Sequence, residues 1–327
     1  MTQAEPMLAR IDRAVAAALP RWGCSPAATA HMINHSENIT YRVEDPQAGR
    51  TTILRVHRPG YHSEAAIRSE LSWLDALRQE AGVVTAATLP AQDGASVQLL
   101  GGDEPRYAVM FSFLGGTEPS EDALLEPFER LGEVTARLHG HARRWTRPEG
   151  FVRQTWDFAT MLGCRPIWGD WRAGMGMNIA RQAQLQLLAD AIERRLRRYG
   201  QRADRFGLIH ADLRLANLLL EGPTTKVIDF DDCGFGWYLY DLGAALSFIE
   251  HRSDVPELVD AWVRGYRRVA PLAAEDEAEI PTFILLRRLL LVAWIGSHAE
   301  TDLAQTMGEA YTEGSCTLAE EYLQRPD

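Results

Sequence analysis

The residues whose types could do chemistry gather in one stretch of the chain, residues 208–241. They are a histidine, an amide and several carboxylates: His210, Asp212, Asn217, Asp229 and Asp231. Two apolar runs, Leu218–Leu220 and Val227–Phe230, flank a Gly-Pro turn and predict a short β-hairpin. Closing that hairpin brings Asn217 and Asp229 together, and amide and carboxylate oxygens are ligands that suit Mg²⁺. Asp212 remains available to act as a base.

The spacing of these residues is typical of phosphoryl transfer. His210, Asp212 and Asn217 fit the pattern H-x-D-x-x-x-x-N, in which the aspartate is the base and the asparagine a metal ligand. Asp229 and Asp231 lie in the run V-I-D-F-D-D, whose first aspartate is the main metal ligand in that template. The first pattern alone is weak evidence. Followed by I-D-F between β-forming residues, it predicts a kinase site.

Bulk composition narrows the function classes. With 327 residues the chain is long enough for two lobes, and its formal charge of −11 argues against a general nucleic-acid binder. An acidic protein suits a cationic or amino-bearing substrate, although many soluble proteins are simply acidic. The four cysteines are scattered, with no zinc or disulfide spacing.

The sequence favours a cytoplasmic protein without a membrane partner. Its first residues lack the basic-then-apolar order of a signal peptide. The longest apolar run, Phe283–Ile295, is interrupted by Arg287 and Arg288 and is too short to span a bilayer.

The first third of the chain reads as β-rich. Turn signals and periodicity predict an opening helix over residues 5–19 and a second helix over 65–79. Strands are expected at residues 39–43, 51–56, 83–89, 96–100 and 107–113. The flexible run Leu114–Thr117 is the expected boundary, which gives an N-terminal lobe of residues 1–113 and a C-terminal lobe of residues 114–327.

The remainder of the chain reads as mostly helical. Ser120 or Asp122 is expected to cap the first of these helices. Further helices are expected at residues 178–199, 239–250, 255–269, 274–295 and 304–322. The predicted fold class is therefore α+β, with a small antiparallel-sheet lobe and a larger helical lobe. The larger lobe carries the acceptor site and residues 210–217, which we call the catalytic loop.

With these motifs in view, the chain resembles the aminoglycoside phosphotransferase family of kinase-like enzymes, which includes homoserine kinase type II, choline kinase and stress-response kinase A. The resemblance is most specific at I-H-A-D-L-R-L-A-N and V-I-D-F-D-D-C-G-F-G-x-x-x-Y-D-L. It implies a two-lobed protein-kinase-like fold with Mg and ATP, or alternatively GTP, bound between the lobes. The product would be a small molecule phosphorylated on a hydroxyl group.

The resemblance also assigns a phosphate clamp. Arg55 stands where the family places a cation on the α- and β-phosphates, usually a lysine, and Glu70 is its expected ion-pair partner. Because Lys226 is the only lysine in the chain, arginine must fill that role if it is filled. The alternative is that Arg55 and Glu70 are ordinary solvated residues.

Other nucleotide contacts are expected from the same resemblance. Residues 34–41 occupy the place of the phosphate-covering loop but contain no glycine, so Ser36 and Asn38 are the expected phosphate contacts. The backbone of Met110–Phe113 is expected to recognise adenine at the hinge.

Four other residues in or near the catalytic loop have expected roles. Arg214 either stabilises the transferring phosphoryl group or meets solvent. His210 is expected to orient the loop, and Asp231 either contacts a second metal or caps the loop. Asp241 is expected to anchor the loop through backbone N–H groups.

Three functions compete. The first is a small-molecule kinase acting on an amino alcohol, amino acid, sugar or aminoglycoside, as a monomer or homodimer. The second is a protein serine/threonine kinase. The sequence argues against it, because only eleven residues separate Asp229 from Asp241 and leave no room for a long activation segment. The third is a nucleotide-binding regulator without turnover.

Overall fold

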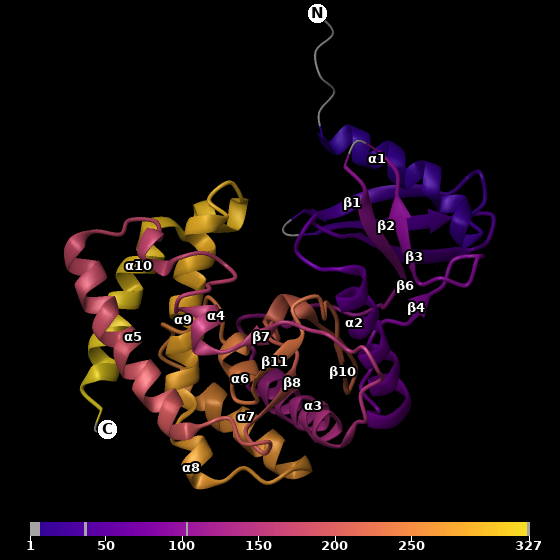
Figure 1. The fold of residues 1–327 in the computed structure, drawn as a ribbon. Coiled ribbons are helices and arrows are strands. Elements are labelled where there is room, and N and C mark those ends of the chain that lie inside the picture. Colours follow the sequence, from indigo (N-terminus) through magenta and orange to yellow (C-terminus); the bar gives the residue numbers. More distant parts are fainter. Residues whose placement is uncertain (1–6, 36–37, 103, 326–327) are drawn as a thin grey trace, which may run out of the picture. The chain divides into compact units, whose positions relative to one another are not determined.

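The computed structural model describes residues 7–35, 38–102 and 104–325 (Figure 1). The chain forms two compact units. The first contains the chain up to Gln79 together with Val84–Gly115 and Arg147–Val152. The second contains Glu80–Val83, Gly116–Thr146 and everything from Arg153 onward. The chain therefore passes from the first unit to the second between Gly115 and Gly116, inside the expected Leu114–Thr117 linker. Nucleotide binding by residues 1–113 and catalysis by residues 114–327 stay predictions.

An antiparallel sheet forms the centre of the first unit, with strand order β1-β2-β3-β6-β4 and β5 paired to β6. Its strands are β1 (Thr29–His35), β2 (Ile39–Asp45), β3 (Arg50–Val56), β4 (Thr88–Leu89), β5 (Val97–Leu100) and β6 (Arg106–Ser112). The helical elements are α1 (Met7–Ala18), a 3₁₀ turn η1 (Leu19–Trp22), α2 (Glu64–Ala76) and a π-helical turn η2 (Leu77–Ala81).

The sequence prediction of this unit was right in outline. Alternating burial along β2 and its pairing with β3 confirm the expected hairpin, and Ile11 and Val15 place the buried face of α1 in the core. The prediction missed β1, because this edge strand is almost entirely exposed and carries no apolar alternation. The strand expected at residues 83–89 is confined to the two residues of β4.

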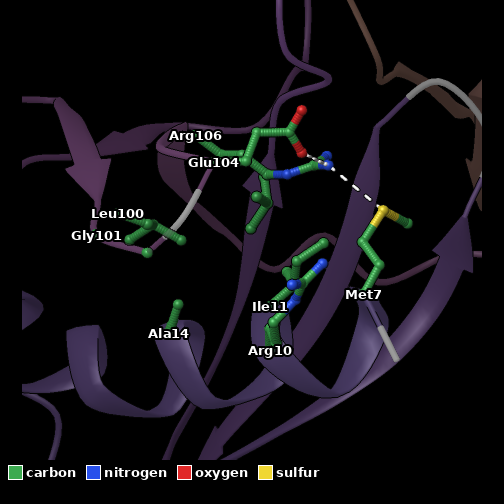
Figure 2. Close-up of a pocket in the computed structure, with 10 residues that line it drawn as sticks. Met7, Arg10, Ile11, Ala14, Leu100, Gly101, Glu104 and Arg106 are labelled. Carbon is green, nitrogen blue, oxygen red and sulfur yellow. Dashed lines mark hydrogen bonds and ion pairs between the residues drawn. The ribbon is translucent and has the colours of Figure 1, made fainter. Parts of the chain in front are cut away.

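A small pocket in the first unit is separate from the predicted catalytic residues (Figure 2). Arg106 closes one side of it, donating to Glu104 Oε2 at 2.6 Å and to Met7 Sδ at 3.7 Å. The lining residues are Met7, Arg10, Ile11, Ala14, Val56, Leu100, Gly101, Gly102, Glu104 and Arg106. None of them belongs to the predicted site. The pocket lies where α1 packs against the sheet.

The second unit is built from helices around two small sheets. Its helices are α3 (Leu125–Arg144), α4 (Phe158–Met161), α5 (Ile179–Tyr199), α6 (Tyr240–Ala245), α7 (Val255–Val269), α8 (Ala274–Glu277), α9 (Ile280–Ser297) and α10 (Asp302–Leu323). Its strands are β7 (Thr155–Trp156), β8 (Phe206–Ile209), β9 (Leu218–Glu221), β10 (Thr224–Val227) and β11 (Gly234–Trp237), with 3₁₀ turns η3 (Trp171–Ala173) and η4 (Leu215–Asn217).

Several helix limits differ from the prediction for identifiable reasons. Neither Ser120 nor Asp122 caps α3, which begins after Leu124 without a side-chain cap. The helix expected over residues 239–250 ends at Ala245, and Phe248 then adopts a φ of 71° that no helix accommodates. The expected helix over residues 274–295 is two helices, since Pro281 lies in the first turn of α9 and cannot continue a preceding helix.

Three helices of the second unit, α3, α7 and α9, show how tightly it is packed. Helices α3 and α7 cross at glycine, since a Cβ on Gly132 would lie 2.1 Å from Trp262 O and one on Gly265 would lie 1.8 Å from Glu129 O. Helix α9 is buried along most of its length. The stretch Ala274–Ser297 is long and apolar enough to cross a membrane, but 83% of its most apolar window is buried in the protein, as expected of a core helix.

Candidate active site

The predicted hairpin is β9 and β10, and it places the candidate metal ligands. The strands pair antiparallel with Leu218 opposite Val227, and Ile228 N donates to Asn217 O at 3.0 Å. Asp229 follows directly, so residues twelve apart in sequence are neighbours across the end of the hairpin. Asp229 has a φ of 59°, a left-handed conformation that is uncommon outside glycine and frequent at functional sites.

Asp212 is held by three side chains. Its Oδ2 accepts from Asn217 Nδ2 at 2.8 Å and from Arg214 Nε at 3.2 Å. Its Oδ1 accepts from Arg287 NH2 at 2.6 Å. Burial acts to raise the pKa of Asp212, but the positive charges of Arg287 and Arg214 outweigh it and hold that pKa below its usual value. Asp212 is therefore ionised at neutral pH and accepts hydrogen bonds only.

His210 makes hydrogen bonds to backbone groups through both ring nitrogens. Its Nδ1 accepts from Asp212 N at 3.2 Å, which leaves Nε2 to donate to Ile228 O at 3.1 Å. That assignment gives a neutral imidazole linking the loop to the end of the hairpin. Both contacts are to backbone groups, as a positioning role requires.

Asp241 anchors the same loop, as the sequence suggested. Its fully buried carboxylate accepts from His210 N at 3.2 Å and from Ala211 N at 2.7 Å. His139 Nε2 is a third partner at 3.0 Å, and burial lowers the pKa of His139 despite that carboxylate, so the ring is neutral. These bonds stabilise a strained turn, because Ala211 has a φ of 69°.

The carbonyl groups of Asp231, Asp232 and Cys233 accept hydrogen bonds from Arg153, before β7, and from Trp156, within it. Arg153 donates to Asp231 O and, at 2.6 Å, to Cys233 O. Trp156 Nε1 donates to Asp232 O at 2.7 Å. Asp231 itself is buried, so its two alternative roles, metal contact or loop cap, both stay predictions.

Asn217 and Asp229, at the end of the β9–β10 hairpin, fit a bound divalent cation. Both hydrogen bonds that Asn217 makes to Asp212 use its amide nitrogen, which turns the amide oxygen toward other ligands. Asp229 adds an exposed carboxylate on the adjacent strand end. Within the described residues no cluster of three His, Cys, Asp or Glu side chains is suited to a metal. Two protein oxygens with substrate phosphates and water completing the shell are what Mg²⁺ ordinarily uses.

In the first unit, the structure pairs Arg55 with Glu70. Arg55 NH2 on β3 lies 2.7 Å from Oε1 and 2.8 Å from Oε2 of Glu70 on α2, and both side chains are buried. The expected ion pair is therefore confirmed and the solvated alternative is wrong. The one lysine, Lys226, lies on β10 and pairs with Glu221 at 2.8 Å. Contact between Arg55 and phosphate stays a prediction.

We expect Arg55→Met to lower kcat by at least about 10²-fold, since it would remove the cation expected on the α- and β-phosphates. The change also leaves Glu70 buried without its cation, which costs about 3–5 kcal/mol of unfolding free energy. Arg55→Lys keeps the charge but loses the planar fork, and should retain activity within about tenfold. Steady-state kinetics with thermal unfolding of each variant measures both effects; equal kcat for Arg55→Met and the parent would contradict the role.

The other predicted nucleotide contacts are less clearly supported. Asn38 is buried and its amide oxygen accepts from Arg58 N at 3.0 Å, while Ser36 lies outside the described residues. Met110 lies inside β6 with its side chain in the core, which leaves only its backbone for adenine. Phe113 follows β6 and is 43% exposed, with Arg42 Cζ 5.2 Å from its ring centre. These contacts stay predictions.

Sequence reasoning missed Arg287, His139 and Arg153, which contact residues of the predicted site. Arg287 and Arg288 were noted only as charges interrupting an apolar run, yet both are buried, and Arg288 pairs with Glu250 at 2.8 Å. That pair lies outside the contacts of the predicted base. Adjacent arginines inside an otherwise apolar helix were the available signal, because such charges are buried only when paired. His139 and Arg153 carried no comparable signal.

Together, the antiparallel sheet with its Arg55–Glu70 pair and the helical unit with its catalytic loop define a protein-kinase-like phosphotransferase. Residues 33–278 match the model of the phosphotransferase enzyme family APH, and the chain belongs to this family.

Similar proteins of known activity are small-molecule kinases. The chain is 48% identical to the solved structure of a microcompartment-associated aminopropanol kinase, with a TM-score of 0.88 over 94% of this chain and 96% of that one. It is 25% identical to the amicoumacin kinase of Bacillus subtilis strain 168, over 92% of this chain and 89% of the relative. An amicoumacin kinase in complex with AMP-PNP, Ca²⁺ and Ami shares the fold at a TM-score of 0.72 and 21% identity, over 89% of this chain and 87% of that one.

Proposed function

We propose that the protein transfers the γ-phosphoryl group of ATP to the hydroxyl of a small amino alcohol. The observation that carries the choice of acceptor is the 48% identity, over nearly the whole of both chains, to an aminopropanol kinase. The formal charge of −11 suits a substrate that carries an ammonium group.

Asp212 is the proposed base. The acceptor hydroxyl donates a hydrogen bond to its carboxylate, and the hydroxyl oxygen attacks phosphorus as the bond from phosphorus to the departing ADP oxygen breaks. The hydroxyl proton then passes to Asp212, late in the step because the transition state is loose and the nucleophile needs little activation. The low pKa of Asp212 agrees with this order, since a weak base orients a hydroxyl better than it deprotonates one early.

Arg214, half-buried beside the base, is the proposed stabiliser of the transferring phosphoryl group. Asn217 and Asp229 would hold Mg²⁺, with Asp231 as a further candidate ligand. When bound, the metal neutralises negative charge on the β- and γ-phosphates. Arg55, oriented by Glu70, would contact the α- and β-phosphates.

The alternatives have less support. A protein kinase needs a docking platform after its metal motif, whereas residues 230–240 here run directly through β11 into the first turn of α6. A regulator without turnover would have no need for an Asp212 carboxylate held by three side chains. We propose that the protein acts in the cytoplasm as a monomer or a homodimer. ATP is the proposed phosphate donor rather than GTP, since an amicoumacin kinase of similar fold is solved with AMP-PNP.

An acceptor screen tests the proposal. The purified protein is incubated with ATP, MgCl₂ and one candidate at a time: aminopropanol, ethanolamine, choline, homoserine, a sugar, spectinomycin, amicoumacin or a general protein substrate. ADP release is measured together with the mass of the acceptor, which should rise by one phosphoryl group. Asp229→Asn, run in parallel, reports background hydrolysis.

We expect the largest kcat/KM for aminopropanol or ethanolamine. Phosphorylation of amicoumacin or spectinomycin in preference to them would keep the chemistry and replace the acceptor class. Phosphorylation of protein alone, or nucleotide binding without any phosphorylated product, would overturn the proposal.

A further inference from the structure

Arg287, on α9, is the buried cation that contacts the proposed base. Its side chain is 1% exposed, and NH2 lies 2.6 Å from Asp212 Oδ1. The rest of the guanidinium is fixed inside the second unit. Nε donates to Ser247 Oγ at 2.8 Å, and NH1 donates to Tyr240 Oη at 3.1 Å. Trp168 covers it, with the guanidinium carbon 5.1 Å from the ring centre.

The contacts of Asp212 leave one side of its carboxylate for the acceptor. A carboxylate has about four lone-pair directions, two on each oxygen. Oδ2 accepts two hydrogen bonds, from Asn217 and Arg214, and Oδ1 accepts one, from Arg287. Counting the donors within the described residues, the direction that remains is on Oδ1, the oxygen that Arg287 holds. Any rotation of the carboxylate that moved this lone pair would break the contact with Arg287.

Stability alone does not account for this arrangement. A buried ion pair contributes little net stability over apolar residues of similar size, because desolvating both charges offsets their attraction. The neighbouring Arg288 shows the purely structural case: its partners are Glu250 Oε2 at 2.8 Å, Ser315 Oγ at 2.8 Å and Tyr311 O at 3.0 Å. Adjacent arginines on one helix thus serve different networks, of which only one includes the base.

We propose that Arg287 is a positioning residue for phosphoryl transfer: it fixes the Asp212 carboxylate so that the acceptor hydroxyl meets the remaining lone pair of Oδ1. The inference rests on the proposed function, because it takes Asp212 as the base. Arg287 acts through Asp212, since its own contacts lie within the fold. Its effect should therefore appear in kcat and leave substrate binding unchanged.

The test compares Arg287→Met with Arg288→Met, a matched control on the next residue that also breaks a buried ion pair. Arg287→Lys, Asp212→Asn and the double variant Asp212→Asn/Arg287→Met complete the set. Each is assayed for kcat, for KM of ATP and of the acceptor identified by the screen, and for thermal unfolding.

We expect Arg287→Met to lower kcat by about 10²-fold, the scale of a misplaced reacting group, with both KM values within about threefold of the parent. Arg288→Met should unfold at a similarly reduced temperature but keep kcat within about threefold. Arg287→Lys should recover part of the loss, because it restores the charge with fewer bonds. In the Asp212→Asn background, adding Arg287→Met should change kcat by less than about threefold, since the group it positions is gone.

Other outcomes separate the possible errors. Equal kcat losses in Arg287→Met and Arg288→Met, or a loss confined to the KM of the acceptor, would overturn the inference. Asp212→Asn with the parent kcat would instead overturn the proposed role of Asp212. If Arg287→Met does not fold, Arg287→Lys and Ser247→Ala decide: both should lower kcat at unchanged KM, and a parental kcat in both would refute the inference.

Discussion

Replacing Asp229 by asparagine is expected to lower kcat by at least about 10³-fold, equivalent to roughly 4 kcal/mol of transition-state stabilisation. The carboxylate is the main charged metal ligand predicted at the end of the β9–β10 hairpin. Asparagine retains its size and one oxygen but not its charge. Charge compensation for the β- and γ-phosphates should therefore fail, and the loss should persist at high MgCl₂.

Asparagine is a better test here than alanine because of the backbone. Asp229 has a φ of 59°, where asparagine is tolerated and alanine is strained by about 1–2 kcal/mol. Asp229→Ala would thus combine a lost ligand with a distorted loop.

Activity is measured as a function of MgCl₂ concentration for the parent, Asp229→Asn and Glu221→Gln. Glu221 is the matched control, because it is an exposed acid at the other end of the same hairpin and pairs with Lys226. We expect parental kinetics for Glu221→Gln. Asp229→Asn that reached a tenth of the parental kcat at saturating MgCl₂ would exclude Asp229 as the main metal ligand.

Asp212→Asn should have the second-largest effect, a fall in kcat of about 10²- to 10⁴-fold, the usual range for a lost general base. The amide can receive the acceptor hydroxyl but cannot take its proton. It also removes the negative charge from between Arg214 and Arg287, which disturbs the placement of the phosphoryl group. KM for ATP should change little, since Asp212 makes no predicted contact with the nucleotide.

Folding must be separated from chemistry in this variant. Arg287 would be left buried without its carboxylate, which we expect to cost about 3–5 kcal/mol of unfolding free energy. Single-turnover rates at 15 °C, corrected for the folded fraction by circular dichroism, isolate the chemical step. A single-turnover rate within threefold of the parent would exclude Asp212 as the base.

The catalytic chemistry was readable from the sequence because it depends on local spacing. The H-x-D-x-x-x-x-N pattern, the Gly-Pro turn and the I-D-F run fix a loop, a hairpin and its ends within a short stretch of chain. The hairpin and its Gly-Pro turn follow from that stretch, but its second strand is Thr224–Val227 and not the predicted apolar run Val227–Phe230. The α+β class was equally accessible, since period-2 and period-3.6 patterns occupy separate parts of the chain.

Element limits were harder to predict where tertiary packing overrides local preference. Strand β1 was missed since exposed edge residues carry no apolar pattern, and α6 is shorter than its sequence suggested because Phe248 takes a left-handed conformation. Such conformations are imposed by surrounding contacts, here including the paired Ser247 and Glu250 on either side.

The sequence by itself indicated the reaction class and the candidate base and metal ligands, because motif spacing specifies them, and the family resemblance predicted the Arg55–Glu70 pairing. Only the tertiary structure decided what surrounds the base. Arg287 reaches Asp212 across 75 positions of sequence, and His139 reaches Asp241 across 102. No local pattern encodes such contacts. They exist because α3 and α9 are packed against the catalytic loop, where a buried charge is stable only beside its partner.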